Sequence, residues 1–421
     1  MNPNLVLGAG QSTLNTLLSE LFAAVKPEIN TKISSILNKE NEKLHAYGIA
    51  SLALVIEEAP IIDLIAGDGN TAGTLELQMN AQLGIHFTQG GTANVDITLK
   101  VGIKMAIETA SGQALLNFQV TSLSIQTNNP SNPTIDEILN NAIIPSQWSR
   151  ISPMRSFPIP PKAISKLHDF HLSLPAIAIQ APNFVAYFST VGTSIPPIPS
   201  PTTWPSNGLF SEIPVTFLQQ TLNNQIGLPI GPHTSPSTTI LHFKIGGDLR
   251  AQINPISQVE IEAGGGITAT ASVIADAELK IKTPHIPIVG SKTFSVGPKA
   301  TGNITFTLKP TIDDNKVKIE IVDITIPDFS FSIDGLPDLL KPIEHLLFRW
   351  LNDLIKPLLE EALKALPLFK VKTLHPHFKI LNQDIDILIQ QLSTSAKDTS
   401  LLVDAQLSFA KATELIPANL S

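Results

Sequence analysis

Apolar residues near the C-terminus recur at spacings of three and four, which predicts a long amphipathic helix over residues 336–366. Pro342 and Pro357 lie inside this segment and predict irregularities in the helix. The apolar stripe consists of Leu339, Ile343, Leu346, Leu347, Trp350, Leu351, Leu354, Ile355, Leu358 and Leu363.

A second amphipathic helix is predicted near the start of the chain, over residues 12–45. Ser12 is a suitable N-cap, and Pro27 predicts a kink. At about 1.5 Å per residue, such a helix is roughly 50 Å long. Its apolar stripe consists of Leu14, Leu17, Leu18, Leu21, Phe22, Val25, Ile29, Ile33, Ile36 and Leu37.

Between these helices, apolar and polar residues alternate, which predicts β-strands. Residues 74–87 and 95–107 form a predicted hairpin around Gly90 and Gly91, with one dry face and arms of roughly 40 Å. A third strand, at 116–125, changes phase between Val120 and Leu123, which predicts a β-bulge.

The second half of the chain repeats these ingredients. We expect a helix over 210–227, strands at 241–253, 259–261, 267–281, 300–308 and 317–326, and closing strands at 380–388 and 401–409. The segment 170–188 is expected to add a strand to an interdomain sheet. The proline-rich stretch 195–208 predicts a linker between an N-terminal domain, 1–194, and a C-terminal domain, 209–421.

The composition narrows the function classes. The chain is 43% hydrophobic but only 5% aromatic, so its apolar surface is mainly aliphatic. A net charge of -8 argues against a nucleic-acid partner, and the lack of cysteine excludes disulfides and thiolate metal sites. We expect no signal peptide and no membrane span. A cytoplasmic location and export by a signal-independent route both stay open.

Motifs that would indicate catalysis or cofactor binding lack their required context. GAGQS at 8–12 and AGGG at 263–266 lack the lysine of a phosphate loop, and Gly264–Gly266 more readily mark a bulge or sheet bend. His168 with His171, and His375 with His377, have no further ligand beside them. There is no G-x-S-x-G. We therefore expect no cofactor, no metal and no enzymatic activity.

Residues 336–411 resemble the bactericidal/permeability-increasing protein family of the tubular lipid-binding superfamily. The helix end LLEEALKALPLF places Leu366, Pro367 and Leu368 at the family's turn, and the strands HPHFKILNQDIDILI and TSLLVDAQLSFAK follow. The opening helix and the proline-rich linker also fit. Animal members carry a signal peptide, a disulfide and a basic N-terminal domain, so bacterial members, including those encoded beside clostridial neurotoxins, are closer in character.

The resemblance implies an elongated two-domain tubular α+β fold, in which each domain wraps a highly twisted antiparallel sheet around a long amphipathic helix. It also implies an apolar groove that holds acyl chains, and hence a lipid carrier that meets a membrane surface transiently. The candidate lipid-binding residues are Leu18, Phe22, Val25, Ile29, Leu347, Trp350, Leu351 and Leu354.

The alternative is a non-catalytic interaction or toxin-accessory protein whose tubes are filled by their own side chains, with an unknown protein partner. For any single stripe residue plain core packing is the favoured reading, whereas the length of the whole groove favours lipid. The many Ala, Gly and Thr positions at 260–281 favour open space. Leu347→Glu separates the two readings, because a groove predicts loss of ligand and a packed core predicts unfolding.

Overall fold

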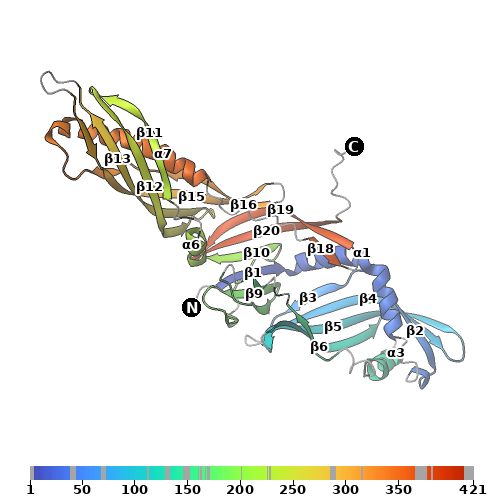
Figure 1. The fold of residues 1–421 in the computed structure, drawn as a ribbon. Coiled ribbons are helices and arrows are strands. Elements are labelled where there is room, and N and C mark those ends of the chain that lie inside the picture. Colours follow the sequence, from blue (N-terminus) through green and yellow to red (C-terminus); the bar gives the residue numbers. More distant parts are fainter. Residues whose placement is uncertain are drawn as a thin grey trace, which may run out of the picture. The chain divides into compact units, whose positions relative to one another are not determined.

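The computed structural model describes residues 4–37, 44–67, 73–110, 113–128, 133–145, 152–159, 161, 164–165, 167, 171–200, 202–224, 226, 229–284, 291–313, 316–365, 377–380 and 383–411. The fold is α+β, with few helices and curled antiparallel sheets (Figure 1). The chain forms two compact units, each with more contacts within itself than with the other. Unit 1 comprises Met1–Glu212, Leu374–Ser393 and Val403–Ser421, and unit 2 comprises Ile213–Thr373 and Thr394–Leu402.

The first sheet of unit 1 contains the predicted hairpin. Its strand order is β2-β4-β5-β6-β7, and β3 also pairs with β4. The register between β5 and β6 shifts where Val120 and Ser122 flank Thr121, so the predicted β-bulge is confirmed. The strands are β2 (Ile49–Ile56), β3 (Ile61–Ile65), β4 (Thr74–Phe87), β5 (Thr92–Ala110), β6 (Gln113–Thr127) and β7 (Arg155–Pro158).

A second sheet, which belongs mainly to unit 1, joins strands from distant parts of the chain. Its order is β18-β19-β20-β10-β1-β9-β8. The sequence analysis did not identify β1, and the segment 170–188 forms the hairpin β8–β9 rather than one strand. The strands are β1 (Asn4–Gly10), β8 (Ala176–Gln180), β9 (Asn183–Ser189), β10 (Leu209–Pro214), β18 (His377–Ile380), β19 (Gln383–Lys397) and β20 (Ser400–Lys411).

Unit 2 contains the third sheet, with the order β11-β12-β13-β15-β16; β14 pairs with β13 and β17 with β15. The strands predicted at 241–253 and 259–261 are one strand, because the pairing continues through a bulge beside Pro255. The strands are β11 (Pro229–Ile240), β12 (Phe243–Ile261), β13 (Ile267–Lys282), β14 (Thr293–Val296), β15 (Lys299–Asp313), β16 (Lys316–Thr325) and β17 (Ser330–Ser332).

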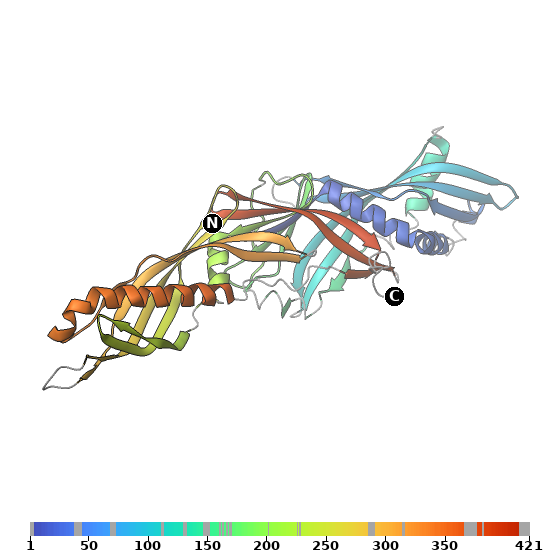
Figure 2. The same ribbon diagram turned by 90° about the horizontal axis from the view of Figure 1, so that it is seen from above.

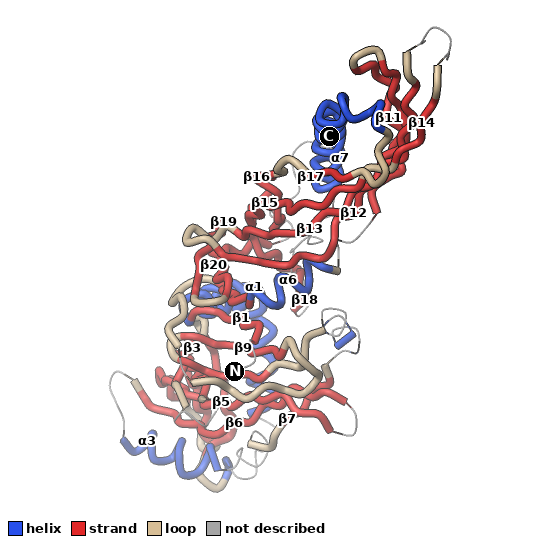
Figure 3. The backbone as a smooth tube through the Cα atoms, turned by 90° about the vertical axis from the view of Figure 1, so that its left-hand side faces the viewer, coloured by secondary structure: helices blue, strands red, loops and turns tan. Residues whose placement is uncertain are grey.

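Both long helices are present. The N-terminal helix, α1 (Gln11–Leu37), contains Pro27 and changes direction along its length in Figure 1. The C-terminal segment begins as a 3-10 helix, η3 (Asp338–Ile343), and continues as α7 (Glu344–Ala365). Helix α7 lies beside the strands of unit 2 and contacts β11 and β12 (Figures 2 and 3). Leu366, Pro367 and Leu368 lie outside the described residues.

The shorter helices differ from the sequence prediction. The predicted helix at 210–227 begins only at Val215, because residues up to Pro214 belong to β10; the observed helix is α6 (Val215–Asn223). Proline is well tolerated at a helix start, because the backbone N–H that it lacks would have no partner within the helix. In unit 1, α3 (Pro133–Ile138) is followed directly by a π-helical turn, η2 (Leu139–Ile143).

The two compact units differ at the C-terminus from the two domains predicted from the sequence. Residues 209–421 were predicted to form one domain after a linker at 195–208. Residues 374–393 and 403–421 instead group with unit 1, because β19 and β20 continue the sheet that contains β10 and β1. Strand pairing over such a sequence separation leaves no local signal in composition.

One kind of hydrogen bonding recurs where helices meet strands. An asparagine carboxamide accepts a bond from the backbone N–H of one strand or loop residue and donates to the C=O of the same residue. The pairs are Asn15 with Ile62 (2.6 and 3.0 Å), Asn30 with Ile56 (2.9 and 3.2 Å), Asn140 with Ile125 (3.2 and 2.7 Å), Asn223 with Ile256 (2.5 and 3.5 Å) and Asn352 with Phe329 (2.7 and 3.2 Å).

Asn352 gives the sharpest test of this interaction, because both its bonds are buried. Asn352→Ala leaves the N–H and C=O of Phe329 without partners, so the free energy of unfolding should fall by about 2–3 kcal/mol. Chemical denaturation measures the change. The control is Asn303→Ala at an exposed position of β15, which should change stability by less than about 0.5 kcal/mol. Equal effects of the two variants would contradict the prediction.

Candidate functional site

The candidate residues on α7 fall into two parallel rows with different exposure. One row is completely buried, at 0–1% exposure. It contains the candidates Leu347 and Leu351 and consists of Ile343, Leu347, Leu351, Ile355, Leu359 and Leu363. The neighbouring row is half-buried; it contains the candidates Trp350 and Leu354 and consists of Leu346, Trp350, Leu354 and Leu358. Leu347 and Leu351 therefore pack in the protein core.

The alanines of β13 do not provide open space, which corrects the interpretation of 260–281. Ala269, Ala271 and Ala275 are 0% exposed and Ala277 is 3% exposed. A cavity large enough for water beside these methyl groups would leave them accessible. The small side chains are therefore surrounded by protein atoms, which is how closely packed interiors accommodate bulky neighbours. Gly264–Gly266 also lie elsewhere than expected, in the turn that joins β12 to β13 rather than at a bulge.

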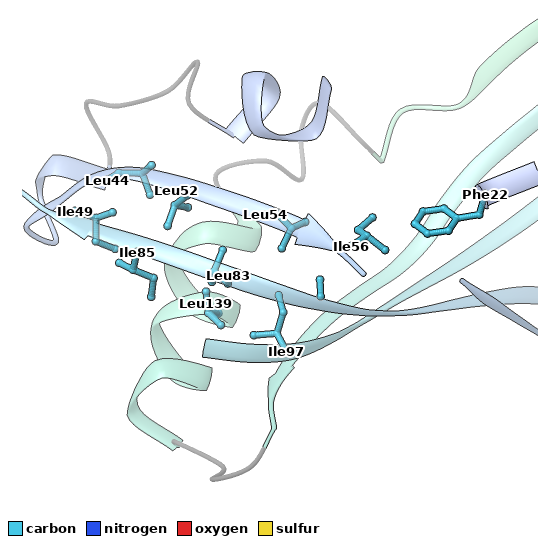
Figure 4. Packing of buried hydrophobic residues seen from close by; sticks show 11 residues of the cluster. Phe22, Leu44, Ile49, Leu52, Leu54, Ile56, Leu83, Ile85, Ile97 and Leu139 are labelled. Atoms are coloured by element: carbon cyan, nitrogen blue, oxygen red, sulfur yellow. The ribbon is translucent and has the colours of Figure 1, made fainter. Parts of the chain in front are cut away.

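The candidates on α1 divide in the same way. Phe22 is 4% exposed and belongs to a buried cluster with Leu52, Ile56 and Ile97, and Ile29 packs against that cluster (Figure 4). Leu18 is half-buried. The side chain of Val25 lies outside the described residues. Among the candidates on α1, Phe22 is therefore a core residue, whereas Leu18 and Ile29 are half-buried.

An extended half-buried apolar surface lies on strands β4, β5 and β6, and we call it the β4–β6 face. Residues paired in an antiparallel sheet point to the same side. The pairing therefore aligns large apolar side chains in cross-strand rows, all of which are half-buried. The rows are Met79, Leu99 and Ile125; Leu77, Val101 and Leu123; Leu75, Ile103 and Val120; Met105 and Phe118; and Ile107 and Leu116.

The dimensions of the β4–β6 face suit an extended apolar ligand. From Leu99 to Ile107 it extends over eight residue-to-residue steps of β5, or about 27 Å at roughly 3.4 Å per step. Three strands give it a width of about 10 Å between outer backbones. One bilayer leaflet has a hydrocarbon depth of only about 15 Å. The face is long enough for a complete acyl chain.

Helix α1 is held at the edge of this sheet rather than over its centre. Its main contacts are with β1, β2 and β3. Asn15 binds the backbone of β3 and Asn30 that of β2, and Gln11 accepts a further bond from the N–H of Leu64 at 3.0 Å. Polar anchors therefore fix the helix beside the β4–β6 face and leave much of the face half-exposed.

The β4–β6 face was visible in the sequence only as a dry side of the predicted hairpin. Alternation identifies which residues share a face, but it does not indicate what covers them. The useful signal was the length of the alternation, because long strands carry more apolar surface than one helix at the sheet edge can bury.

The first glycine motif has a structural explanation, and each histidine pair lies partly outside the described residues. Gly8 and Gly10 lie in β1, where a Cβ atom would collide with the Phe210 ring and with the Ser206 carbonyl, respectively. His168 and His375 lie outside the described residues. Within the described segments, no group of three or more His, Cys, Asp or Glu side chains could hold a metal ion. No helix in those segments has the length and apolar character needed to cross a membrane.

Titratable groups with shifted pKa values lie in the second sheet of unit 1, not on the β4–β6 face. Burial raises the pKa of Tyr187 to about 12, although the nearby Trp204 and Gln180 side chains oppose the rise. The Trp204 indole donates to the Gln180 side-chain oxygen at 2.9 Å. Burial also raises the pKa of Asp404.

The Tyr187 shift predicts a loss of stability at alkaline pH. Because the pKa is raised from 10.0 to about 12, the folded protein retains the phenol proton that the unfolded chain releases. The stabilising contribution is present below pH 10 and is lost as the pH rises through about 12. Tyr187→Phe should lose less stability than the wild type over this interval, as measured by urea denaturation at each pH. Parallel pH profiles would contradict the assignment.

Comparisons with known proteins add little to this geometry. The sequence matches no family model, and no curated protein sequence is significantly similar. A crystal structure of a lipopolysaccharide binding protein is similar over 97% of this chain and 100% of that chain, with 13% identity and a TM-score of 0.34. P47 from Clostridium botulinum A2 is similar over 96% of this chain and 97% of that chain, with 10% identity and a TM-score of 0.42. At these scores neither likeness carries an argument about function.

The two rows of α7 give a matched pair of substitutions. Leu347→Glu places a carboxylate at a position with 1% exposure, so unit 2 should lose more than about 3 kcal/mol of stability. Leu354→Glu, in the half-buried row of the same helix, should cost clearly less. Thermal denaturation and limited proteolysis measure both. Equal costs would show that the fully buried row does not form the core of unit 2.

Proposed function

We propose that this chain is a lipid-binding protein and that the β4–β6 face of unit 1 holds an acyl chain. The observation that supports this proposal most directly is the aligned set of half-buried, mainly aliphatic side chains on three neighbouring strands. Soluble proteins rarely leave a continuous apolar surface of this kind without a binding role. On this proposal Leu18 borders the acyl chain from α1, while Phe22 and Ile29 support the adjacent core.

The energetics favour exchange of the lipid with a membrane over permanent capture. Burial of one CH₂ group contributes about 0.8 kcal/mol, so a sixteen-carbon chain gains roughly 13 kcal/mol relative to water. A bilayer offers nearly the same gain. Protein and membrane therefore compete on almost equal terms, which supports a carrier that meets the membrane surface transiently.

We propose a different role for unit 2, in which its helix and sheet pack against each other without ligand. The support is the complete burial of the α7 core row together with the β13 alanines. The wrapping of a sheet around a long helix, as the sequence resemblance implies, would then serve stability in this unit. Of the α7 candidates, Trp350 and Leu354 keep enough exposure to contact a ligand.

The proposal requires no catalysis and no cofactor. The β4–β6 face offers aliphatic side chains, the thioethers of Met79 and Met105 and the ring of Phe118, which supply neither a nucleophile nor a general base. Uncharged aliphatic surface discriminates weakly between acyl chains, so binding should tolerate chain length and depend on apolar area. A nucleic-acid partner is not part of the proposal.

A pair of glutamate substitutions on β5 tests the acyl site. Val101→Glu introduces a carboxylate on the β4–β6 face, whereas Ala106→Glu adds the same charge at an exposed position on the opposite face. After incubation of each protein with phospholipid vesicles, native mass spectrometry and solvent extraction measure bound lipid. Val101→Glu should reduce occupancy at least about tenfold, because an acyl chain cannot solvate a carboxylate. Ala106→Glu should leave occupancy unchanged.

Circular dichroism confirms that both variants are folded before lipid is measured. Absence of extractable lipid from the wild type after vesicle incubation would contradict the proposal and favour a non-catalytic interaction protein. Lipid that is retained by folded Val101→Glu but lost from folded Leu354→Glu would move the site to unit 2.

A further inference from the structure

The outer face of the sheet in unit 2 carries a hollow unrelated to the apolar surfaces. Its volume is about 760 Å³, within the range of small-molecule sites. The hollow lies over strands β11 to β14, on the side of the sheet opposite the buried alanines. Its charged lining residues are Lys244, Lys280 and Lys282, together with Asp248 and Glu278.

Strand pairing places these lysines on one side of the sheet. Lys244 pairs directly with Lys282, and Lys280 pairs with Gly246 on the next outward-facing row. On the other side of β13, Lys280 pairs with Ser295 and Lys282 with Thr293. Because paired residues share a face, the hydroxyl-bearing residues lie on the same face as the ammonium groups.

This arrangement places like charges opposite each other, and a bound anion would relieve their repulsion. Like charges directly opposite each other on neighbouring strands destabilise a sheet. Among the described residues, none of the three lysines makes a salt bridge.

The nearest acidic groups do not compensate the lysines. Asp248 and Glu278 pair with each other on the next row, so they too face a like charge. The Thr234 hydroxyl donates to Asp248 at 2.8 Å, and Arg250 approaches Glu278 at 3.9 Å. If one lysine of the Lys244–Lys282 pair and one carboxylate of the Asp248–Glu278 pair were exchanged, each pair would contain opposite charges. In the actual sequence each pair contains like charges.

Glycine leaves space above the sheet between the lysines. Gly246 lies opposite Lys280 and has no side chain to fill the space between Lys280 and β11. Its hypothetical Cβ would meet only Ser237, at 3.4 Å. The hollow therefore combines three ammonium groups and the hydroxyl groups of Thr293 and Ser295, which are usual partners of phosphate oxygens, with two carboxylates on the adjoining row.

We propose that Lys244, Lys280 and Lys282 bind a phosphate group, with the Thr293 and Ser295 hydroxyls as further donors. The phosphate belongs either to a lipid headgroup at a membrane surface or to a soluble metabolite; both present the same anionic oxygens. This site is independent of the acyl-binding proposal, because it lies in the other unit and uses no residue of the β4–β6 face.

Isothermal titration with inorganic pyrophosphate tests the site in the full chain. Lys280→Gln and Lys282→Gln should each weaken binding about tenfold or more, because each removes a charge-assisted contact. Lys309→Gln is the matched control, since Lys309 is exposed on β15 of the same unit and outside the hollow. It should leave the affinity within about twofold.

Stability provides a second readout that does not depend on the ligand. Lys282→Gln removes the charge opposite Lys244, so its melting temperature without anion should be equal to or higher than that of the wild type. Pyrophosphate should raise the melting temperature of the wild type and of Lys309→Gln more than that of Lys282→Gln.

Vesicle sedimentation distinguishes the two phosphate sources. Wild-type binding to phosphatidylcholine vesicles that contain phosphatidic acid, lost in Lys280→Gln, would support a lipid headgroup. Pyrophosphate binding without vesicle binding would support a soluble phosphate compound. The proposal is overturned if the wild type binds neither probe, or if Lys309→Gln weakens binding as much as Lys280→Gln does. Lipid occupancy in Val101→Glu remains a separate measurement, so failure of either proposal can be recognised.

Discussion

The backbone groups of open strand edges need hydrogen-bond partners, and in this protein helix carboxamides supply them. An unpaired N–H or C=O excluded from water is costly, and an exposed edge invites pairing with another chain. Asn15 hydrogen-bonds to both the N–H and the C=O of one residue of β3, and Asn30 does so with one residue of β2. Asn352 makes the same pair of bonds with Phe329, which lies beside β17. An asparagine side chain presents one donor and one acceptor, as a neighbouring strand would. This interaction fixes where each helix can lie against its sheet.

Helices anchored in this way produce different results in the two units, because the facing strands differ in side-chain size. On β13 the inward positions at the centre are largely alanine, and the surrounding protein leaves them without accessible surface. On β4, β5 and β6 the corresponding positions carry Leu, Ile, Val and Met, while α1 contacts the edge strands. Large residues beside an edge-bound helix remain half-exposed. The same architecture therefore forms a dry core in one unit and an apolar surface in the other.

The sequence predicted local features well and long-range ones poorly. Periodicity located α7, most of α1 and the hairpin β4–β5, and a change of phase located the bulge at Thr121. Periodicity did not identify β1, because LVLGAG is short and contains two glycines. These glycines allow the Phe210 ring and the Ser206 carbonyl to approach the strand closely, which only the structure reveals. Burial was harder still. Leu347 and Leu354 belong to the same sequence stripe, yet only the packed structure separates a core position from a half-buried one.

The lysine-lined hollow and the β4–β6 face share a physical property, although one is polar and the other apolar. Each keeps an arrangement that weakens the free protein: Lys244 opposite Lys282 in one case, incompletely buried apolar area in the other. Simple substitutions would relieve either, such as a glutamate opposite a lysine or a threonine on the half-buried face. Positions where local choices oppose stability are where function is expected, because a ligand can supply the missing interaction. On the two proposals made above, the faces offer complementary binding chemistries, one for hydrocarbon and one for phosphate.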